Sequence, residues 1–261
     1  MDSYNFNWKK TLHLVAEKVK ARIADVIPQR CSLSVNGFKN ILDSVAQETI
    51  KDTLSELGAS VKLVSEEGDV KIGSGDFVVV ADPVDGTTNL SRGLHPAVAS
   101  LSVADGASQS DVFAGLVMDL YYGDVFYAER DSGASLNGIS IRVAKPVKYR
   151  DSLISMDISK IPRLNKVKEL VEESQHIRME GCSAMSLCNV AAGFLDAHID
   201  VRGIVRATDI SAGLIILREA KGVYSINGEV FGDMPLTRST RVELIGTNSM
   251  ELLNEIRGLM K

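Results

Sequence analysis

Two aspartates stand three positions apart in residues 82–89, which read Asp-Pro-Val-Asp-Gly-Thr-Thr-Asn. The apolar run at 77–81 predicts a buried strand that the Asp-Pro pair ends. Carboxylates at a strand end can hold a hard cation, and Gly86 lets a ligand approach the backbone. Thr87 and Thr88 follow where a short helix could begin with unpaired amides facing an anion. These residue types predict a metal and phosphate site, although an Asx turn with solvated acids is the simpler interpretation.

Further acidic residues occupy comparable positions. Glu66 and Glu67 follow a second predicted strand, at 61–64, and neighbouring strands of one sheet would bring these ends together. Asp209 opens a predicted helix, where a carboxylate also serves as a plain cap. Asp43 lies on another predicted helix. Taken one at a time, an exposed acidic turn, a helix cap and a solvated helix residue remain open as alternatives.

The elements that must position these residues follow from periodicity. Residues 8–27 and 42–57 predict amphipathic helices, whereas 29–40 lacks a helical period and is predicted to be mainly a loop. Antiparallel strands are predicted at 98–103, 112–118 and 125–129, and Asn137-Gly138 is a hairpin signal. Residues 144–150 are the best candidate for the boundary between an N-terminal and a C-terminal part of the chain. Beyond it strands and helices alternate: strands at 153–156, 197–201 and 223–226, helices at 164–173, 184–194 and 210–220.

Composition limits the class of protein. The 261-residue chain is 45% hydrophobic and 24% charged, as is ordinary for a globular enzyme. A net charge of −5 argues against nucleic acid as a partner. No apolar run reaches membrane-spanning length, so we expect no membrane partner. The N-terminus lacks signal-peptide features, and the three cysteines without CxxC spacing fit a reduced cytoplasm, which is the predicted location.

Three segments together resemble the inositol monophosphatase family of metal-dependent phosphatases. Residues 82–89 look like its first signature, and residues 208–213 (Thr-Asp-Ile-Ser-Ala-Gly) are similar to its second, in which most members have Trp before the Asp. Residues 65–67 (Ser-Glu-Glu) match the family's Gly-Glu-Glu. The resemblance covers nearly the whole chain in the expected order.

The resemblance implies a fold between α+β and α/β, a layered α/β/α/β/α sandwich of the sugar phosphatase type. The active site would lie between an N-terminal subdomain, 1–148, and a C-terminal subdomain, 149–261. It also implies Mg²⁺ as cofactor, with two ions and room for a third, and a homodimer. The metal ligands carried over from the family are Glu66, Asp82, the carbonyl of Val84, Asp85 and Asp209.

The same resemblance assigns further roles. The amides of Gly86 and Thr87 would hold phosphate oxygens. Thr87 and Asp43 would orient and deprotonate the attacking water, with Glu66 as a further catalytic residue. Candidates for substrate contact are Asp85, Ser183, Asp200 and Arg202, with Arg206 and Arg178 as weaker ones. For Asp200 and Arg202 an exposed ion pair is the alternative.

Thr208 and the loop 200–206 look like archaeal family members that hydrolyse inositol 1-phosphate and fructose 1,6-bisphosphate. The predicted substrate is therefore a small phosphorylated sugar or polyol. A 3′-phosphoadenosine 5′-phosphate phosphatase is the alternative, although no aromatic residue near 208–213 supplies a stacking surface. A non-catalytic metal- or phosphate-binding regulator is the alternative of another class. It draws on residues 36–41 (Asn-Gly-Phe-Lys-Asn-Ile), which lack the Asp, Thr and Pro that relatives carry in a mobile loop.

Overall fold

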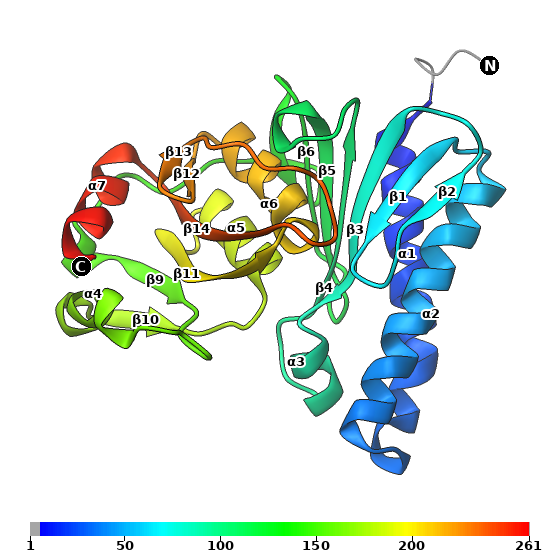
Figure 1. The fold of residues 1–261 in the computed structure, drawn as a ribbon, viewed down its shortest axis with the longest axis horizontal. Helices are drawn as coiled ribbons and strands as arrows, with labels where there is room; N and C mark the ends of the chain where they lie inside the picture. The colour runs from blue at the N-terminus through cyan, green and yellow to red at the C-terminus, as the bar shows by residue number, and fades with distance from the viewer. Residues whose placement is uncertain (1–5, 261) are drawn as a thin grey trace.

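The computed structural model describes residues 6–260, which form two β-sheets and helices in alternating layers (Figure 1). Two long helices cover the outer face of the first sheet, two lie between the sheets, and two pack outside the second sheet. This arrangement confirms the predicted α/β/α/β/α sandwich. In that order the helices are α1 (Trp8–Val26) and α2 (Val35–Glu56), α5 (Ser183–Ala191) and α6 (Ala207–Glu219), α4 (Lys168–Glu173) and α7 (Met250–Leu259).

The first sheet has the strand order β2-β1-β3-β4-β5-β6-β7-β8. Its strands are β1 (Val61–Ser65), β2 (Val70–Ile72), β3 (Phe77–Asp85), β4 (Val98–Ala104), β5 (Val112–Asp119), β6 (Val125–Glu129), β7 (Gly133–Leu136) and β8 (Ile139–Ile141). Among the described strands of this sheet only β1 and β3 pair in parallel. Strands β3 to β8 form an antiparallel meander, which includes the three antiparallel strands predicted at 98–103, 112–118 and 125–129. Asn137 and Gly138 join β7 to β8 with φ values of 51° and 79°, as a two-residue hairpin turn requires.

The second sheet has the order β10-β9-β11-β14-β12-β13. Its strands are β9 (Leu153–Met156), β10 (His176–Arg178), β11 (Ala197–Arg206), β12 (Val223–Ile226), β13 (Glu229–Val230) and β14 (Arg241–Thr247). The predicted strands at 153–156, 197–201 and 223–226 are present, but β11 continues to Arg206. Strands β2, β10, β13 and β14 and helix α7 were not predicted. The first three are two or three residues long, too short for a period to show. The division at 148/149 stays a prediction.

The prediction that residues 29–40 are mainly a loop was wrong. Residues Ile27–Ser32 form a 3₁₀ helix, and α2 begins at Val35. Ser34 caps α2 by accepting a hydrogen bond from the Gly37 amide at 3.1 Å. Phe38 is 1% exposed and packs in the core, which anchors this first turn. The segment expected to be a mobile loop is therefore the start of the helix that carries Asp43.

Three other predicted boundaries also need correction. Strand β3 does not stop before Asp82: Asp82 pairs with Ser100 and Asp85 with Val98, with an irregularity between them. Such an irregularity tolerates Pro83, which cannot donate to the ladder. The predicted helix at 164–173 divides into a 3₁₀ turn and α4, and the helix predicted at 184–194 ends at Ala191. Helix α3 (Thr87–Arg92) begins where a short helix was expected.

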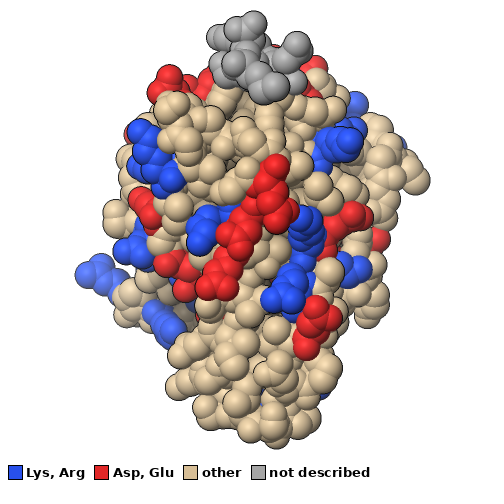
Figure 2. Space-filling model, turned by 90° about the vertical axis from the view of Figure 1, so that its right-hand side faces the viewer, with Lys and Arg blue, Asp and Glu red and all other residues tan. Residues whose placement is uncertain are grey.

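The surface formed by α1 and α2 is mixed in charge. Figure 2 shows a row of acidic side chains flanked on both sides by basic ones, so this face presents no uniformly basic patch of the kind that binds a phosphate backbone. Among the described residues, no helix is both long and apolar enough to cross a membrane.

Candidate metal and phosphate site

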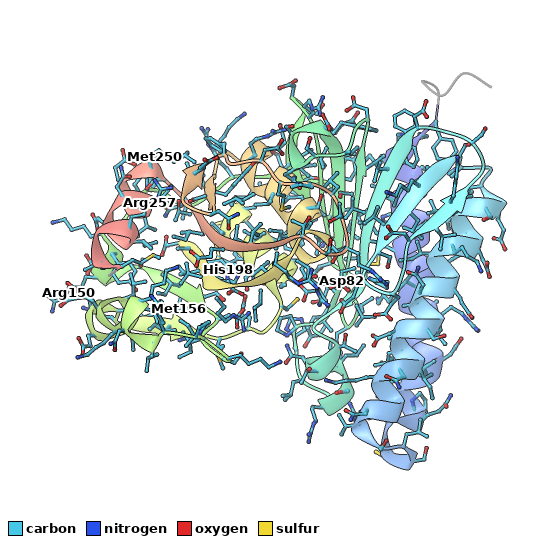
Figure 3. All side chains as sticks on the ribbon, in the orientation of Figure 1. Asp82, Arg150, Met156, His198, Met250 and Arg257 are labelled. Atoms are coloured by element: carbon cyan, nitrogen blue, oxygen red, sulfur yellow. The ribbon has the colours of Figure 1, made fainter. Side chains whose placement is uncertain are left out.

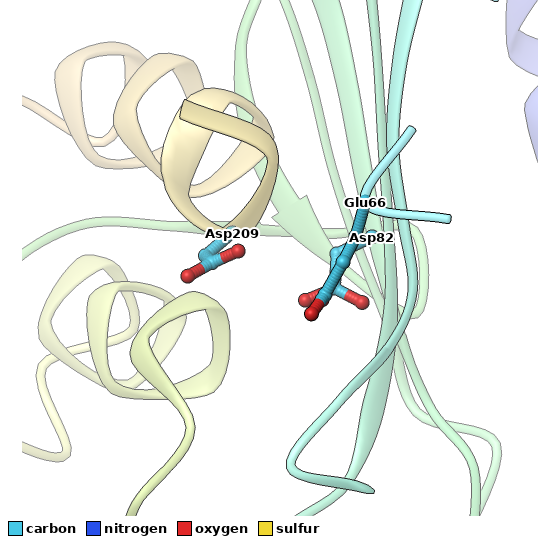
Figure 4. Close-up of side chains that lie close together, drawn as sticks. All are labelled: Glu66, Asp82 and Asp209. Carbon is cyan, nitrogen blue, oxygen red and sulfur yellow. The ribbon is translucent and has the colours of Figure 1, made fainter. Parts of the chain in front are cut away.

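Three carboxylates converge between the two sheets (Figure 4). Glu66 directly follows β1, and Asp82 lies in β3, its parallel neighbour. Parallel neighbours end at the same edge of a sheet, which brings these two residues together. Asp209 faces them from the first turn of α6, and one oxygen from each residue lies within 4.8 Å of the other two. Figure 3 places Asp82 at the junction of the two halves of the molecule.

Asp82 is almost fully buried and is only half satisfied. Its side chain is 2% exposed, and its Oδ1 accepts a hydrogen bond from the Val84 amide at 3.0 Å. Its Oδ2 is buried and has no hydrogen-bond partner among the described residues. Burial, and then the charges of Asp209 and Asp85, raise the pKa of Asp82 well above its usual value. A buried carboxylate oxygen without a donor, beside two further carboxylates, is a place where a cation fits.

Asp85 is held from the other half of the molecule. It is 9% exposed, and its Oδ2 accepts a hydrogen bond at 2.8 Å from the amide of Ala184 in α5. Burial, followed by the charge of Asp209, raises the pKa of Asp85 to about 7. Asp85 is not one of the three converging residues, and the Val84 carbonyl accepts the Thr87 hydroxyl at 2.8 Å. Metal ligation by Asp85 and Val84 therefore stays a prediction.

Arg206 lies inside the carboxylate cluster. Its Nε donates to Asp209 Oδ1 at 2.9 Å, and another guanidinium nitrogen donates to Glu66 Oε1. Burial raises the pKa of Asp209, and the Arg206 charge opposes this rise. The sequence made Arg206 only a weak candidate for substrate contact. In the structure it joins Glu66, just after β1, to Asp209 on α6.

Thr87 and Asp43 meet as the family resemblance implied. The Thr87 hydroxyl lies 3.4 Å from Asp43 Oδ1, in addition to its shorter contact with the Val84 carbonyl. Burial, and then the neighbouring Glu67, raise the pKa of Asp43 to about 6. Asp43 is therefore not a freely solvated helix residue. Its role as a base stays a prediction.

Sequence reasoning missed Lys39. Its Nζ donates to the Thr88 hydroxyl at 2.7 Å and so links α2 to α3 beside the site. Lys39 and Asp43 are four positions apart, which places them on one face of a helix. This spacing is informative only within a helix, and the segment was expected to be a loop, so the sequence did not single out Lys39.

The turn between β3 and α3 is tightly constrained. Gly86 has φ +91°, and a Cβ at this position would lie 2.6 Å from the Pro96 carbonyl oxygen. Asn89 Nδ2 donates to the carbonyls of Pro96 at 2.9 Å and Glu180 at 2.8 Å, which holds the turn against two other segments. The first amides of a helix have no acceptor within it. Those at the start of α3 suit phosphate oxygens, and binding by Gly86 and Thr87 stays a prediction.

The candidates for substrate contact differ in access. Asp200 is 0% exposed and forms a bidentate pair with Arg202, at 2.8 and 2.5 Å, so the pair is buried rather than exposed. Arg202 also donates to the Ser159 carbonyl and keeps some exposure. Substrate contact by Asp200 and Arg202 stays a prediction. The Ser183 hydroxyl makes no hydrogen bond within the described chain, and Arg178 donates to its neighbouring carbonyl on β10.

Known proteins resemble this chain over most of its length. The sequence model of the inositol monophosphatase family matches residues 8–258. The chain is 30% identical to a fructose-1,6-bisphosphatase/inositol-1-monophosphatase of Thermococcus kodakarensis, over 98% of each chain. It is 29% identical to a bifunctional NADP phosphatase/NAD kinase of Methanococcus maripaludis, over 80% of this chain and 40% of that protein. A solved inositol monophosphatase–fructose 1,6-bisphosphatase superposes with a TM-score of 0.83 at 26% identity, covering 98% of this chain and 100% of that one.

Proposed function

The chain belongs to the inositol monophosphatase family and is a phosphoric monoester hydrolase, and we propose that it uses Mg²⁺ to hydrolyse inositol 1-phosphate, fructose 1,6-bisphosphate or both. One observation carries the proposal. Carboxylates from two sides of the molecule bring oxygens within 4.8 Å of one another, and one of these residues, Asp82, has a buried Oδ2 without a hydrogen-bond partner in the described part of the chain. The substrates are those named for the archaeal relatives.

The donor set fits Mg²⁺, because this ion prefers oxygen ligands and completes its shell with water and substrate phosphate. Glu66, Asp82 and Asp209 would hold it, with Asp85 and the Val84 carbonyl as further ligands. Bound there, the metal would supply positive charge to the phosphoryl oxygens and lower the pKa of a bound water. The number of ions, two or three, is part of the proposal.

The chain's own residues would perform the remaining work. Thr87 and Asp43 would orient the attacking water and accept its proton, and the raised pKa of Asp43 brings this carboxylate closer to the operating pH. The amides of Gly86 and Thr87 would hold the phosphate so that its charge is stabilised as the bond breaks. Arg202, supported by Asp200, would contact the rest of the substrate. Water attacks directly, without a covalent enzyme intermediate.

A nucleotide substrate is the second candidate. The relative named as a bifunctional NADP phosphatase/NAD kinase supports testing NADP together with 3′-phosphoadenosine 5′-phosphate. The homodimer and the cytoplasmic location remain predictions from the sequence.

The test measures phosphate release from inositol 1-phosphate, fructose 1,6-bisphosphate, NADP and 3′-phosphoadenosine 5′-phosphate. It is made with Mg²⁺ and with EDTA, on the wild-type protein and on Asp82→Asn. We expect Mg²⁺-dependent release from the sugar and polyol phosphates that the variant loses. Asp105→Asn is the matched control, because Asp105 is exposed and lies far along the sheet from the site. It directly follows the last residue of β4, whereas Asp85 pairs with Val98 at the start of that strand. The control variant is expected to behave as wild type.

Each alternative outcome has a defined meaning. Release from the nucleotides alone would keep the metal site and overturn the proposed substrates. Release that persists in EDTA or in Asp82→Asn would overturn the metal site. Absence of release from all four, with Mg²⁺ still bound, would favour the non-catalytic regulator.

A further inference from the structure

Arg206 occupies the position in the site where a positive charge is needed. Glu66 and Asp209 have no other ion-pair partner in the part of the chain that the structure describes, and both pair with this one guanidinium. A divalent cation held by the same carboxylates would meet the guanidinium at close range. Like charges a few ångströms apart in a partly buried site repel strongly.

Asp209 does not depend on the guanidinium for its orientation. Its Oδ2 accepts a hydrogen bond from the Arg206 backbone amide at 3.2 Å, and its Oδ1 accepts one from the Thr208 hydroxyl at 3.1 Å. Both bonds would persist if the Arg206 side chain moved away. The carboxylate therefore stays aimed at the cluster with or without its ion pair.

The Arg206 side chain also has room to leave. The Arg206 side chain is 30% exposed, whereas the Asp209 side chain is 12% exposed. Arginine carries its charge on a long stem, so the guanidinium can move into solvent or onto an anion without moving the backbone.

We propose that Arg206 is a built-in counter-cation of the metal-free site, which must leave Glu66 and Asp209 before a divalent cation takes their oxygens. The inference rests on the proposed function, because it assumes that a metal binds there. Arg206 thus weakens metal binding and stabilises the protein without metal. A residue that only oriented the ligands would do the opposite to metal affinity, since its loss would weaken binding.

The test measures Mn²⁺ binding by calorimetry and by electron paramagnetic resonance, with no substrate present. Arg206→Gln is expected to bind Mn²⁺ about tenfold more tightly than wild type, because a repelling charge has been removed. Arg206→Lys keeps the positive charge but loses the planar guanidinium that engages both acids. Its affinity for Mn²⁺ is expected to lie between those of wild type and Arg206→Gln. Arg218→Gln is the matched control: Arg218 lies in the last turn of α6, the helix that Arg206 precedes, and pairs with Glu219.

Thermal unfolding in EDTA is the second measurement. Arg206→Gln is expected to melt at a lower temperature than wild type in EDTA, and to gain more from saturating Mn²⁺. If Arg206→Gln does not fold without metal, Arg206→Lys provides the comparison.

The outcomes separate the two proposals. Metal binding by wild type that is unchanged or weaker in Arg206→Gln would overturn the inference and leave the proposed function intact. Binding by the variant but not by wild type would support the inference. If neither protein binds metal, both proposals fail.

Discussion

Replacing Gly86 by Ala tests whether the turn after β3 must be glycine for reasons of space. The residue has φ +91°, and a Cβ would lie 2.6 Å from the Pro96 carbonyl oxygen and 3.2 Å from the Ala97 Cα. Both contacts are with backbone, which cannot turn aside as a flexible side chain can. Asn89 further holds the Pro96 carbonyl through its side-chain amide.

The expected cost has two parts. A left-handed backbone costs a non-glycine residue about 1–2 kcal/mol, and forcing an extra carbon into packed surroundings costs about 1–3 kcal/mol more. A second glycine, Gly133, allows the backbone cost to be measured without the packing cost. It has φ +80°, and a Cβ there would meet nothing within 4 Å. Gly133→Ala is therefore expected to lose about 1–2 kcal/mol from the backbone alone. Gly86→Ala should lose about 2–5 kcal/mol.

Urea unfolding of both variants in Mg²⁺ measures these losses, and phosphate release measures the effect on the site. Relief of the clash would displace the amides proposed to hold phosphate, and a displacement of about 1 Å can cost on the order of 10²-fold in rate. Gly133→Ala is expected to retain its activity. Equal unfolding free energies for the two variants, with activity kept in Gly86→Ala, would refute the reasoning.

Three further predictions follow from the same site. In EDTA, Asp82→Asn is expected to raise the free energy of unfolding by about 1 kcal/mol or more, although it abolishes activity, because it removes a buried charge among other acids; a lower urea midpoint would contradict this. Asn89→Ala should cost about 1–3 kcal/mol, because two carbonyls lose their donor, and an unchanged urea midpoint would argue against the clamp. Stability in EDTA should fall as pH rises from about 4 to about 7, because folding raises the pKa of Asp43 from 3.8 to about 6 and that of Asp85 from 3.8 to about 7. The folded protein then binds these protons more tightly than the unfolded chain does, an advantage present in full below pH 3.8 and lost above the folded pKa values. Urea midpoints across this pH range test the prediction, and a flat or rising profile would contradict it.

Much of the fold was predictable because its signals are local. The antiparallel meander follows from strands separated by turn residues, and the Asn137-Gly138 hairpin from a turn that needs positive φ at both positions. Residues 29–40 are the exception. No helical period is visible there, yet Ser34 caps a helix whose first turn is anchored by the buried Phe38. Burial by distant elements decided that segment, and it concealed the contact that Lys39 makes beside the site.

The candidate site was predictable to the extent that residue types carry it. Asp82 and Asp85 at a strand end, with Glu66 after a neighbouring strand, indicate a cation site from chemistry and spacing alone. Lys39 and Arg206 could not be ranked in this way, because a basic residue has no sequence signal that separates a site from a solvated surface. Their partners lie 49 and up to 140 positions away in the chain.

The sequence by itself therefore determined which chemistry is available: oxygen ligands, a hydroxyl–carboxylate pair and a glycine turn, on elements whose order implies a layered sandwich. Only the tertiary structure decided how these groups meet. Packing α6 between the two sheets brings Asp209 opposite Asp82, whose Oδ2 is buried without a hydrogen-bond partner in residues 6–260. It also places Arg206 between two acids. Burial and charge proximity arise between residues far apart in the chain, so no local pattern can specify them.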